Sequence, residues 1–279
     1  MPLISSNPTP IVLTIAGSDS GGGAGIQADI KAISATGSYA CSAITAITAQ
    51  NTLGVSAVYP LPLDILEQQL EAIFCDIPVL AVKIGMLADA PIIAQVAKKL
   101  RQYQPKWIVL DPVMLSTSGH HLLAGEAVET LKRELLPLAS IITPNLPEAA
   151  VLVGMTEQEW QHNPQQGIAA LRQLDTQAVL LKGGHNHQQM DSDDLLIEVD
   201  NIRHFRAPRI ATKNTHGTGC SLSSAIASYL AQGYALKDAV EKAKQYIHQA
   251  ILHADQLKIG QGYGPVHHFY QLQMDKSEV

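Results

Sequence analysis

Short apolar segments alternate along the chain with longer segments in which apolar residues recur at helical spacing. The short segments are rich in Val, Ile and Ala and end in polar or glycine-rich turns, which is typical of buried parallel strands. We predict such strands at 11–17, 40–49, 81–86, 106–114, 140–145 and 178–184. The segments 193–200 and 202–208 have the composition of an antiparallel pair.

The longer segments predict helices. Residues 24–35 have helical composition, and 90–103 has apolar residues at the spacing of one helix face. Asp64 is a typical N-cap residue, so the helix that runs to Phe74 is expected to begin there. Further helices are predicted after Pro147 and at 125–135, 219–232 and 237–253.

This alternation of strands and helices predicts an α/β fold with a mostly parallel sheet and helices on both of its faces. No linker, repeat or low-complexity tract interrupts the pattern, so residues 1–279 are expected to form one domain. In folds of this class the ligand binds at the carboxyl ends of the strands. Several predicted strands end in polar or glycine-rich turns, and these turns are where we expect the chemistry.

The composition narrows the class of protein. Hydrophobic residues make up 46% and aromatic residues only 5%, so an aliphatic core is expected. The net charge is -6 and no basic tract occurs, which argues against a nucleic-acid partner. The start of the chain lacks the features of a secretory signal, and no apolar run is long enough to span a membrane. The three cysteines form no C-x-x-C motif, and a cytoplasmic protein is the simplest interpretation.

Two glycine-rich loops are candidates for phosphate binding. The loop "GSDSGGGAG" at 17–25 fits neither the P-loop nor the G-x-G-x-x-G template, but its glycines allow a ligand to approach the backbone closely. In "HGTGC" at 216–220, Gly217 and Gly219 free several N–H groups, and the following helix adds its positive end. Together they predict an anion hole for a transferring phosphoryl group. The alternative for the second loop is a capped helix start with a buried cysteine.

Side chains at other strand ends add polar groups. Asp111, Asn145 and Glu148 offer the oxygen ligands that Mg²⁺ prefers, although Glu148 could serve only to cap the helix after Pro147. Lys182 can reach a phosphate, with a solvated lysine as the alternative. The amide of Gln50 offers a donor beside an acceptor, which matches a ring nitrogen beside an exocyclic amine, as in an aminopyrimidine.

These loops belong to longer segments that occur in order along nearly the whole chain: "LTIAGSDSGGGAGIQADIK", "ITAQNTLGV", "VLDPVM", "ITPNLPEA", "TKNTHGTGCSLSSAIA" and "GYGPVHHF". In these segments the chain resembles the hydroxymethylpyrimidine/phosphomethylpyrimidine kinases of thiamine biosynthesis, a branch of the ribokinase-like superfamily. It departs from them in the first loop, where that family often reads T-D-P-S-G-G-A-G and this chain carries Ser18, Ser20 and Gly21. We expect this departure to alter the mobility of the loop and not its chemistry.

The resemblance implies a ribokinase-like three-layer α/β/α domain with a mostly parallel central sheet. It also implies phosphorylation of 4-amino-5-hydroxymethyl-2-methylpyrimidine by ATP, first to the monophosphate and then to the diphosphate. The residues that it would place around the pyrimidine are Gly17, Asp29, Gln50, Met86 and Val113. Those near ATP would be Lys182, Thr212, Asn214, Thr215, Gly217 and Gly219. Those that would organise Mg²⁺ are Asp111, Asn145 and Glu148.

Cys220 stands where most sugar kinases of that superfamily have an aspartate that acts as a base toward an alcohol. A fixed carboxylate there would repel an incoming phosphate monoester by roughly 4 kcal/mol per unit charge pair at about 4 Å and an effective dielectric constant of about 20. A thiol avoids this repulsion, and a helix N-terminus lowers the pKa of cysteine toward neutrality. We therefore expect Cys220 to be a base in the first step and neutral in the second, with simple packing as the alternative.

Other functions stay open at this point. A pyridoxal or pyridoxine kinase, or an enzyme that accepts both rings, would have the same fold and a similar substrate. A non-catalytic sensor of a pyrimidine or a vitamin would need to have lost part of the phosphate site, whereas Lys182 and the acidic pair are present. The large apolar helices favour self-association as a homodimer or another homo-oligomer.

Overall fold

A computed structural model of the protein describes residues 9–114, 125–183 and 191–272. The described strands form one mixed sheet in the order β3-β2-β1-β4-β5-β6-β7-β8-β9. Its members are β1 (Ile11–Asp19), β2 (Tyr39–Asn51), β3 (Gly54–Pro60), β4 (Ala81–Ile84), β5 (Trp107–Leu110), β6 (Ile141–Ile142), β7 (Val179–Leu181), β8 (Asp194–Ile197) and β9 (Ile202–Phe205). The central strands β2, β1, β4, β5, β6 and β7 run parallel, and antiparallel strands flank them at both ends.

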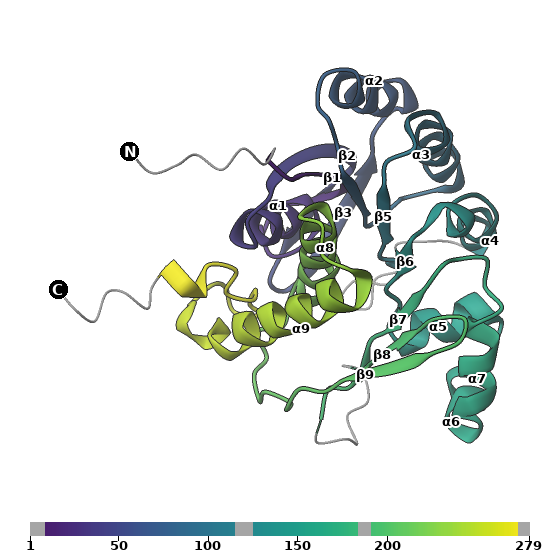
Figure 1. Ribbon diagram of the computed structural model, residues 1–279. Helices are drawn as coiled ribbons and strands as arrows, with labels where there is room; N and C mark the ends of the chain where they lie inside the picture. The colour runs from purple at the N-terminus through teal and green to yellow at the C-terminus, as the bar shows by residue number, and fades with distance from the viewer. Residues whose placement is uncertain (1–8, 115–124, 184–190, 273–279) are drawn as a thin grey trace, which may run out of the picture.

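Helices cover both faces of this sheet (Figure 1). They are α1 (Gly25–Ala35), α2 (Leu63–Phe74), α3 (Ala90–Tyr103), α4 (Gly125–Glu134), α5 (Leu146–Val153), α6 (Glu157–His162), α7 (Pro164–Leu171), α8 (Thr218–Ala231) and α9 (Leu236–Leu252). One apolar core joins α2 to α7 with one face of the sheet, and a second core joins α1, α8 and α9 with the other. Neighbouring strand residues alternate between the two cores, as Leu13 and Val12 do, because successive side chains of a strand point to opposite faces.

The predicted elements and the observed ones agree along most of the chain. The antiparallel pair at the second edge of the sheet is confirmed by β8 and β9. The edge strand β3 and the short helices α6 and α7 were not predicted. The predicted cap at Asp64 is wrong, since α2 begins at Leu63 and its N-cap residue is Pro62, whose side chain makes no cap hydrogen bond. Asp64 instead lies in the first turn, where an acidic side chain interacts favourably with the positive end of the helix dipole.

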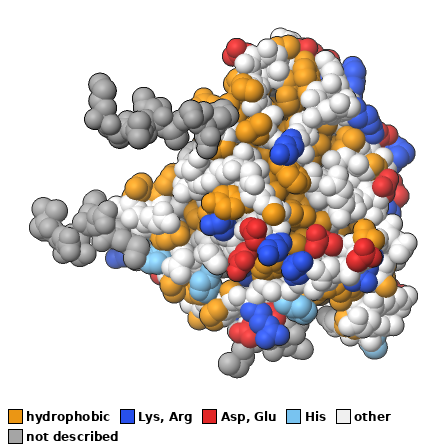
Figure 2. Space-filling view, viewed as in Figure 1, with side chains coloured by type: hydrophobic (Ala, Val, Ile, Leu, Met, Phe, Trp, Pro, Cys, Tyr) orange, Lys and Arg blue, Asp and Glu red, His pale blue; other side chains and the backbone are white. Residues whose placement is uncertain are grey.

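Acidic and basic side chains lie interspersed on the face shown in Figure 2. Within the described part of the chain, no helix is both long enough and apolar enough to cross a membrane.

A buried ion pair lies beneath the start of α8. Nζ of Lys83 is 2.8 Å from both carboxylate oxygens of Asp29, and neither side chain has exposed surface. The hydroxyls of Thr14 and Ser224 donate to the same carboxylate at 2.6 and 2.8 Å. Burial alone would lower the pKa of Lys83, but Asp29 and other nearby acids raise it above its usual value. The ammonium of Lys83 therefore stays charged, and its contacts with Asp29 join α1 and α8 to β1 and β4.

We predict that Asp29→Asn and Lys83→Met each lower the free energy of unfolding by about 3–5 kcal/mol, because each leaves one buried charge without its partner. The double variant should lose much less than the sum of the two, since it removes both charges together. Urea unfolding followed by circular dichroism measures all three. As a control, Lys132→Met on the exposed Lys132–Glu129 pair should change the free energy by less than about 1 kcal/mol. Additive single-variant costs would contradict this account of the pair.

Candidate functional site

Two glycine-rich loops from distant parts of the chain lie in contact where β1 ends and α8 begins. A Cβ atom on Gly217 would lie 1.8 Å from the carbonyl oxygen of Gly23, so only glycine permits this approach. A Cβ atom on Gly23 would lie 2.3 Å from Cδ2 of His216. The structure therefore brings the segment 214–220 onto the loop 17–25, as a site shared between the two loops requires.

The helix α8 begins at this contact. Gly217 is its N-cap residue and has a left-handed backbone with a φ of 79°. Glycine has no side chain to cap the first N–H groups of the helix, and the hydroxyl of Ser221 donates to the Gly217 carbonyl at 2.8 Å. The N–H groups of Gly219 and Cys220 lie in the first turn, where an α-helix has no carbonyl of its own to accept them. With the positive end of the helix dipole, these amides can bind an anion.

Lys182 lies in a cluster with two buried carboxylates. Its Nζ is 2.8 Å from Oδ1 of Asp111 and 3.9 Å from Oε2 of Glu148. A Cβ atom on Gly219 would lie 3.2 Å from this Nζ and 3.5 Å from Oδ2 of Asp111, so the start of α8 faces the cluster. These side chains come together because Asp111, Glu148 and Lys182 follow the parallel strands β5, β6 and β7, whose carboxyl ends meet at one edge.

The charges of this cluster are set by burial and by one another. Burial raises the pKa of Glu148 to about 7, and the nearby Asp111 carboxylate adds to the rise. The Lys182 ammonium acts in the opposite direction and lowers this pKa. Burial also acts to raise the pKa of Asp111, but Lys182 and Lys83 bring it below its usual value. Burial would lower the pKa of Lys182, and the two carboxylates raise it above its usual value. Near neutral pH, Glu148 can therefore gain or lose a proton when a phosphate or a cation arrives.

Glu148 and Asn145 also cap α5. The N–H of Glu148 donates to Oδ1 of Asn145 at 2.9 Å, and the N–H of Asn145 donates to Oε2 of Glu148 at 2.8 Å. This reciprocal pair is a capping box. The capping role considered for Glu148 is therefore present, yet its carboxylate also lies beside Lys182.

Cys220 is part of the first turn of α8, and its thiol has a raised pKa. Burial raises the pKa to about 11, while the Lys83 ammonium and the N–H of Gly25 act in the opposite direction. The expected fall of this pKa toward neutrality is therefore wrong. The helix N-terminus does favour a thiolate, but the loss of hydration at this half-buried position outweighs it.

We predict from this pKa that Cys220 is alkylated slowly at pH 8, where only about one thiol in a thousand would be ionised, because the thiolate is the reactive form. Iodoacetamide labelling followed by mass spectrometry of the peptides should show the exposed Cys75 modified first. The rate at Cys220 should rise steeply as the pH increases toward 11. Equal labelling of Cys75 and Cys220 at pH 8 would contradict the raised pKa.

Several residues expected around a pyrimidine lie near the first loop. A Cβ atom on Gly17 would lie 3.1 Å from Sδ of Met86, so these two residues are adjacent. Gln50 follows Thr48 and Ala49 at the end of β2, and its amide lies 3.2 Å from Nε2 of His216. Met86, Gln50 and Val113 are all half-buried. Their part in ligand binding stays a prediction.

Asp29 is placed differently from this expectation. Its carboxylate is fully buried and is bound by Lys83, Thr14 and Ser224. It therefore presents no surface to a ligand in the structure. A direct contact with a pyrimidine would require this network to open.

The other residues expected near ATP form contacts that hold their loop in place. Thr212 and Asn214 both donate to Oδ1 of Asp255, Asn214 at 2.7 Å. Oδ1 of Asn214 accepts from the N–H of Gly264 at 3.1 Å. The carbonyl of Thr215 accepts from Thr218 at the start of α8. These bonds tie the approach to α8 to the C-terminal part of the chain.

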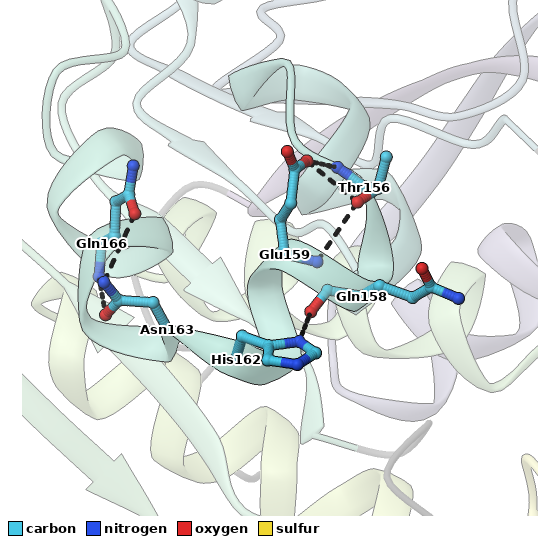
Figure 3. Close-up of a pocket in the computed structure, with 6 residues that line it drawn as sticks. All are labelled: Thr156, Gln158, Glu159, His162, Asn163 and Gln166. Atoms are coloured by element: carbon cyan, nitrogen blue, oxygen red, sulfur yellow. Dashed lines mark hydrogen bonds between the residues drawn. The ribbon is translucent and has the colours of Figure 1, made fainter.

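A separate hollow lies on the surface of α6 and α7 (Figure 3). It is lined by Thr156, Gln158, Glu159, His162, Asn163 and Gln166. Within it, Thr156 and Glu159 form the capping box of α6, and His162 bonds to the carbonyl of Gln158. None of the predicted site residues lines this hollow, and Thr156, Glu159 and Asn163 serve there as capping residues of α6 and α7.

Two residues of the site were not singled out from the sequence. Nε2 of His216 lies 2.9 Å from Oδ2 of Asp19, so this pair joins the two loops. Both residues stand inside the quoted glycine-rich segments. An acid in one loop and a histidine in the other are the signal that could have revealed the contact.

The chain is similar to known proteins along most of its length. Residues 19–267 match the family model described as phosphomethylpyrimidine kinase. A hydroxymethylpyrimidine/phosphomethylpyrimidine kinase from Rhizobium meliloti (strain 1021) is 51% identical, over 94% of this chain and 98% of its own length. One from Escherichia coli (strain K12) is 49% identical, over 92% of this chain and 97% of its own length. The crystal structure of an ADP complex of Bacillus subtilis pyridoxal kinase is similar with a TM-score of 0.87 at 35% identity, covering 95% of this chain and 100% of that one. The expected ribokinase-like α/β fold is confirmed.

Proposed function

Because this chain belongs to the phosphomethylpyrimidine kinase family, we propose that it phosphorylates 4-amino-5-hydroxymethyl-2-methylpyrimidine with ATP, first to the monophosphate and then to the diphosphate. The observation that carries this proposal is the contact of three parts: the open amides of α8, the ammonium of Lys182 and the carboxylate of Asp111. Phosphoryl transfer needs little covalent chemistry from a protein, and positioning with charge stabilisation supplies most of the catalysis.

Each part has a role in this reaction. The N–H groups at Gly217, Gly219 and Cys220 would hold the equatorial oxygens of the transferring group. Lys182 would neutralise the charge that develops on the ATP phosphates. Thr212, Asn214 and Thr215 would border the nucleotide, and their bonds toward Asp255 and Thr218 would keep that border rigid. Gly17, Gln50, Met86 and Val113 would line the ring pocket, with Asp29 beneath it.

Mg²⁺ fits this site as an ion held mainly by phosphates and water. Within the three described stretches of the chain, no group of three or more His, Cys, Asp or Glu side chains forms a metal site. Mg²⁺ commonly binds through one or two carboxylates and substrate phosphates. Asp111 and Glu148 would supply those carboxylates, and Asn145, whose amide oxygen caps α5, would act through water. The ion would supply charge neutralisation on the phosphates.

Cys220 takes a narrower role than the sequence suggests. With a pKa of about 11, its thiol is neutral at physiological pH. A neutral thiol adds no charge beside a phosphate monoester, so the second phosphorylation meets no repulsion at this position. In a loose transition state, the proton of the substrate alcohol leaves late, and a strong base is not required for the first step.

A product assay tests the proposed function. The purified protein is incubated with the aminopyrimidine alcohol, ATP and Mg²⁺, and the products are separated by anion-exchange chromatography over time. The proposal expects the monophosphate to appear first and the diphosphate to replace it, with one ADP formed at each step. ATP that is not consumed, or a monophosphate that never advances, would contradict it.

Pyridoxal phosphorylation is the second candidate, and the likeness to Bacillus subtilis pyridoxal kinase favours it. The same assay with pyridoxal as the acceptor distinguishes the two. A diphosphate from the pyrimidine together with a monophosphate from pyridoxal would indicate an enzyme that accepts both rings. The cytoplasmic location and the homo-oligomer expected from the sequence remain part of this proposal.

A further inference from the structure

We propose that His216 determines ring specificity, because the protons on its neighbours require the Gln50 amide to turn its carbonyl oxygen toward the phosphate loop. The structure records this amide the other way round, with Nε2 at 3.2 Å from His216 and Oε1 at 3.1 Å from the Thr48 hydroxyl. An amide with its oxygen toward the phosphate loop pairs with a ring that carries an amino group next to its hydroxymethyl carbon. The inference rests on the proposed function, since it assigns the feature of the pyrimidine that the site recognises. His216 is a positioning residue, which acts on the ring through Gln50.

Asp19 is the fixed point of this arrangement. Its Oδ1 accepts from the N–H of Gly21 at 2.8 Å, and its Oδ2 accepts from Gly23 and Ala24 at 3.0 and 2.8 Å. Burial acts to raise the pKa of Asp19, but the hydrogen bonds from His216 and the backbone bring it below its usual value. Asp19 is therefore an ionised carboxylate that can only accept hydrogen bonds.

His216 must donate to this carboxylate. Its Nε2 lies 2.9 Å from Oδ2 of Asp19, so this nitrogen carries a proton. A protonated ring nitrogen has no lone pair left to accept a hydrogen bond. Nε2 of Gln50 lies 3.2 Å from the same nitrogen, which sets one donor against another. The oxygen and nitrogen of an amide have nearly the same shape, so the hydrogen-bond partners decide between them, and here they call for the oxygen at His216.

Thr48 leads to the same assignment from the other end of the amide. Its hydroxyl is 2.9 Å from the carbonyl oxygen of Ser18 and 3.1 Å from the Gln50 amide. The hydroxyl has one proton, so it cannot serve both the Ser18 carbonyl and Oε1 of Gln50 fully, and the shorter contact is the one to Ser18. The hydroxyl oxygen is then free to accept from the Gln50 NH₂. With the oxygen of the amide at His216 and its nitrogen at Thr48, every donor in this group has its own acceptor.

This orientation matches one arrangement of the ring. His216 precedes Gly217 and Gly219, so the amide oxygen lies on the side of the phosphate loop. In the substrate, the amino group is next to the carbon that carries the hydroxymethyl arm, and the arm must point at that loop. The amino group then donates to the amide oxygen, and the adjacent ring nitrogen accepts from the amide nitrogen.

The test uses an analogue with the opposite pattern, in which a carbonyl replaces the amino group and the adjacent ring nitrogen carries a proton. Wild type should prefer the amino compound over this analogue by at least about a hundredfold in kcat/KM, since mismatched polar groups in a site built for hydrogen bonds cost that much or more. His216→Phe keeps a ring against Gly23 and removes the donor. The ratio should then fall to within about tenfold, because the amide can turn to match either ring.

His216→Gln is the matched variant, since its amide NH₂ can donate to both Asp19 and Gln50, and it should keep most of the discrimination. His162→Gln, on the exposed face of α6, should leave the ratio unchanged. A role of His216 in packing alone would lower kcat/KM for both compounds equally and keep the ratio of wild type. That result would overturn the inference.

Binding of the two rings without ATP, measured by calorimetry, gives the same ratio without turnover. If wild type binds the amino compound but transfers no phosphate, the proposed function fails while the ratio still decides the role of His216. If wild type binds neither ring, both proposals fall.

Discussion

Replacing Lys182 with methionine should lower kcat about a thousandfold with little change in the KM for the pyrimidine. Its ammonium lies 2.8 Å from Asp111 and faces the first turn of α8. In this largely dehydrated position it would neutralise the charge that develops during transfer, and loss of one preorganised partner of that charge costs about 10²–10³ in kcat. The loss should exceed the lower end of this range, because Asp111 and Glu148 would then repel the phosphates without compensation.

The matched control for this prediction is Lys213→Met. Lys213 is exposed and lies on the segment that leads into the site, so its removal changes the net charge equally. Steady-state kinetics on both variants, with circular dichroism to verify folding, should show a large loss in kcat for Lys182→Met only. If Lys182→Met keeps more than about a tenth of the kcat of wild type, the ammonium is not part of the transfer step.

Much of the site could be predicted because its residues follow predictable strands. Asp111, Glu148 and Lys182 come after apolar segments, and the carboxyl ends of parallel strands meet at one edge. The glycines of the two loops predict positions where the backbone comes close to another group. The structure shows such a close approach between Gly217 and Gly23. Local sequence therefore carries the information about which side chains lie at that edge.

What could not be predicted depends on partners far away in the sequence. Asp29 becomes a buried ion-pair residue because Lys83 reaches it from β4, and no local pattern links the two. The thiol of Cys220 is subject to two opposed effects, a helix N-terminus and burial, and only the packing decides which is larger. The helices α6 and α7 are short and carry many polar residues, so their periodicity gives little signal.

The central claim is that the transferring phosphoryl group lies between the start of α8 and Lys182, and Gly219→Ala tests it most directly. An added methyl group would lie 3.2 Å from Nζ of Lys182 and 3.5 Å from Oδ2 of Asp111, inside the space that the phosphate needs. Gly219 does not have a positive φ, so alanine fits the backbone, and its higher helix propensity should leave the fold as stable as before or more so.

The decisive measurement is the kcat of Gly219→Ala for the first phosphorylation, beside its thermal midpoint of unfolding. Gly125→Ala, where an added methyl group meets nothing within 4 Å, is the control and should behave as wild type. For Gly219→Ala we predict a kcat at least about a hundredfold below wild type, with an unchanged or higher midpoint, because the methyl group displaces the oxygens that the amides would hold. A stable Gly219→Ala protein with the kcat of wild type would contradict the claim.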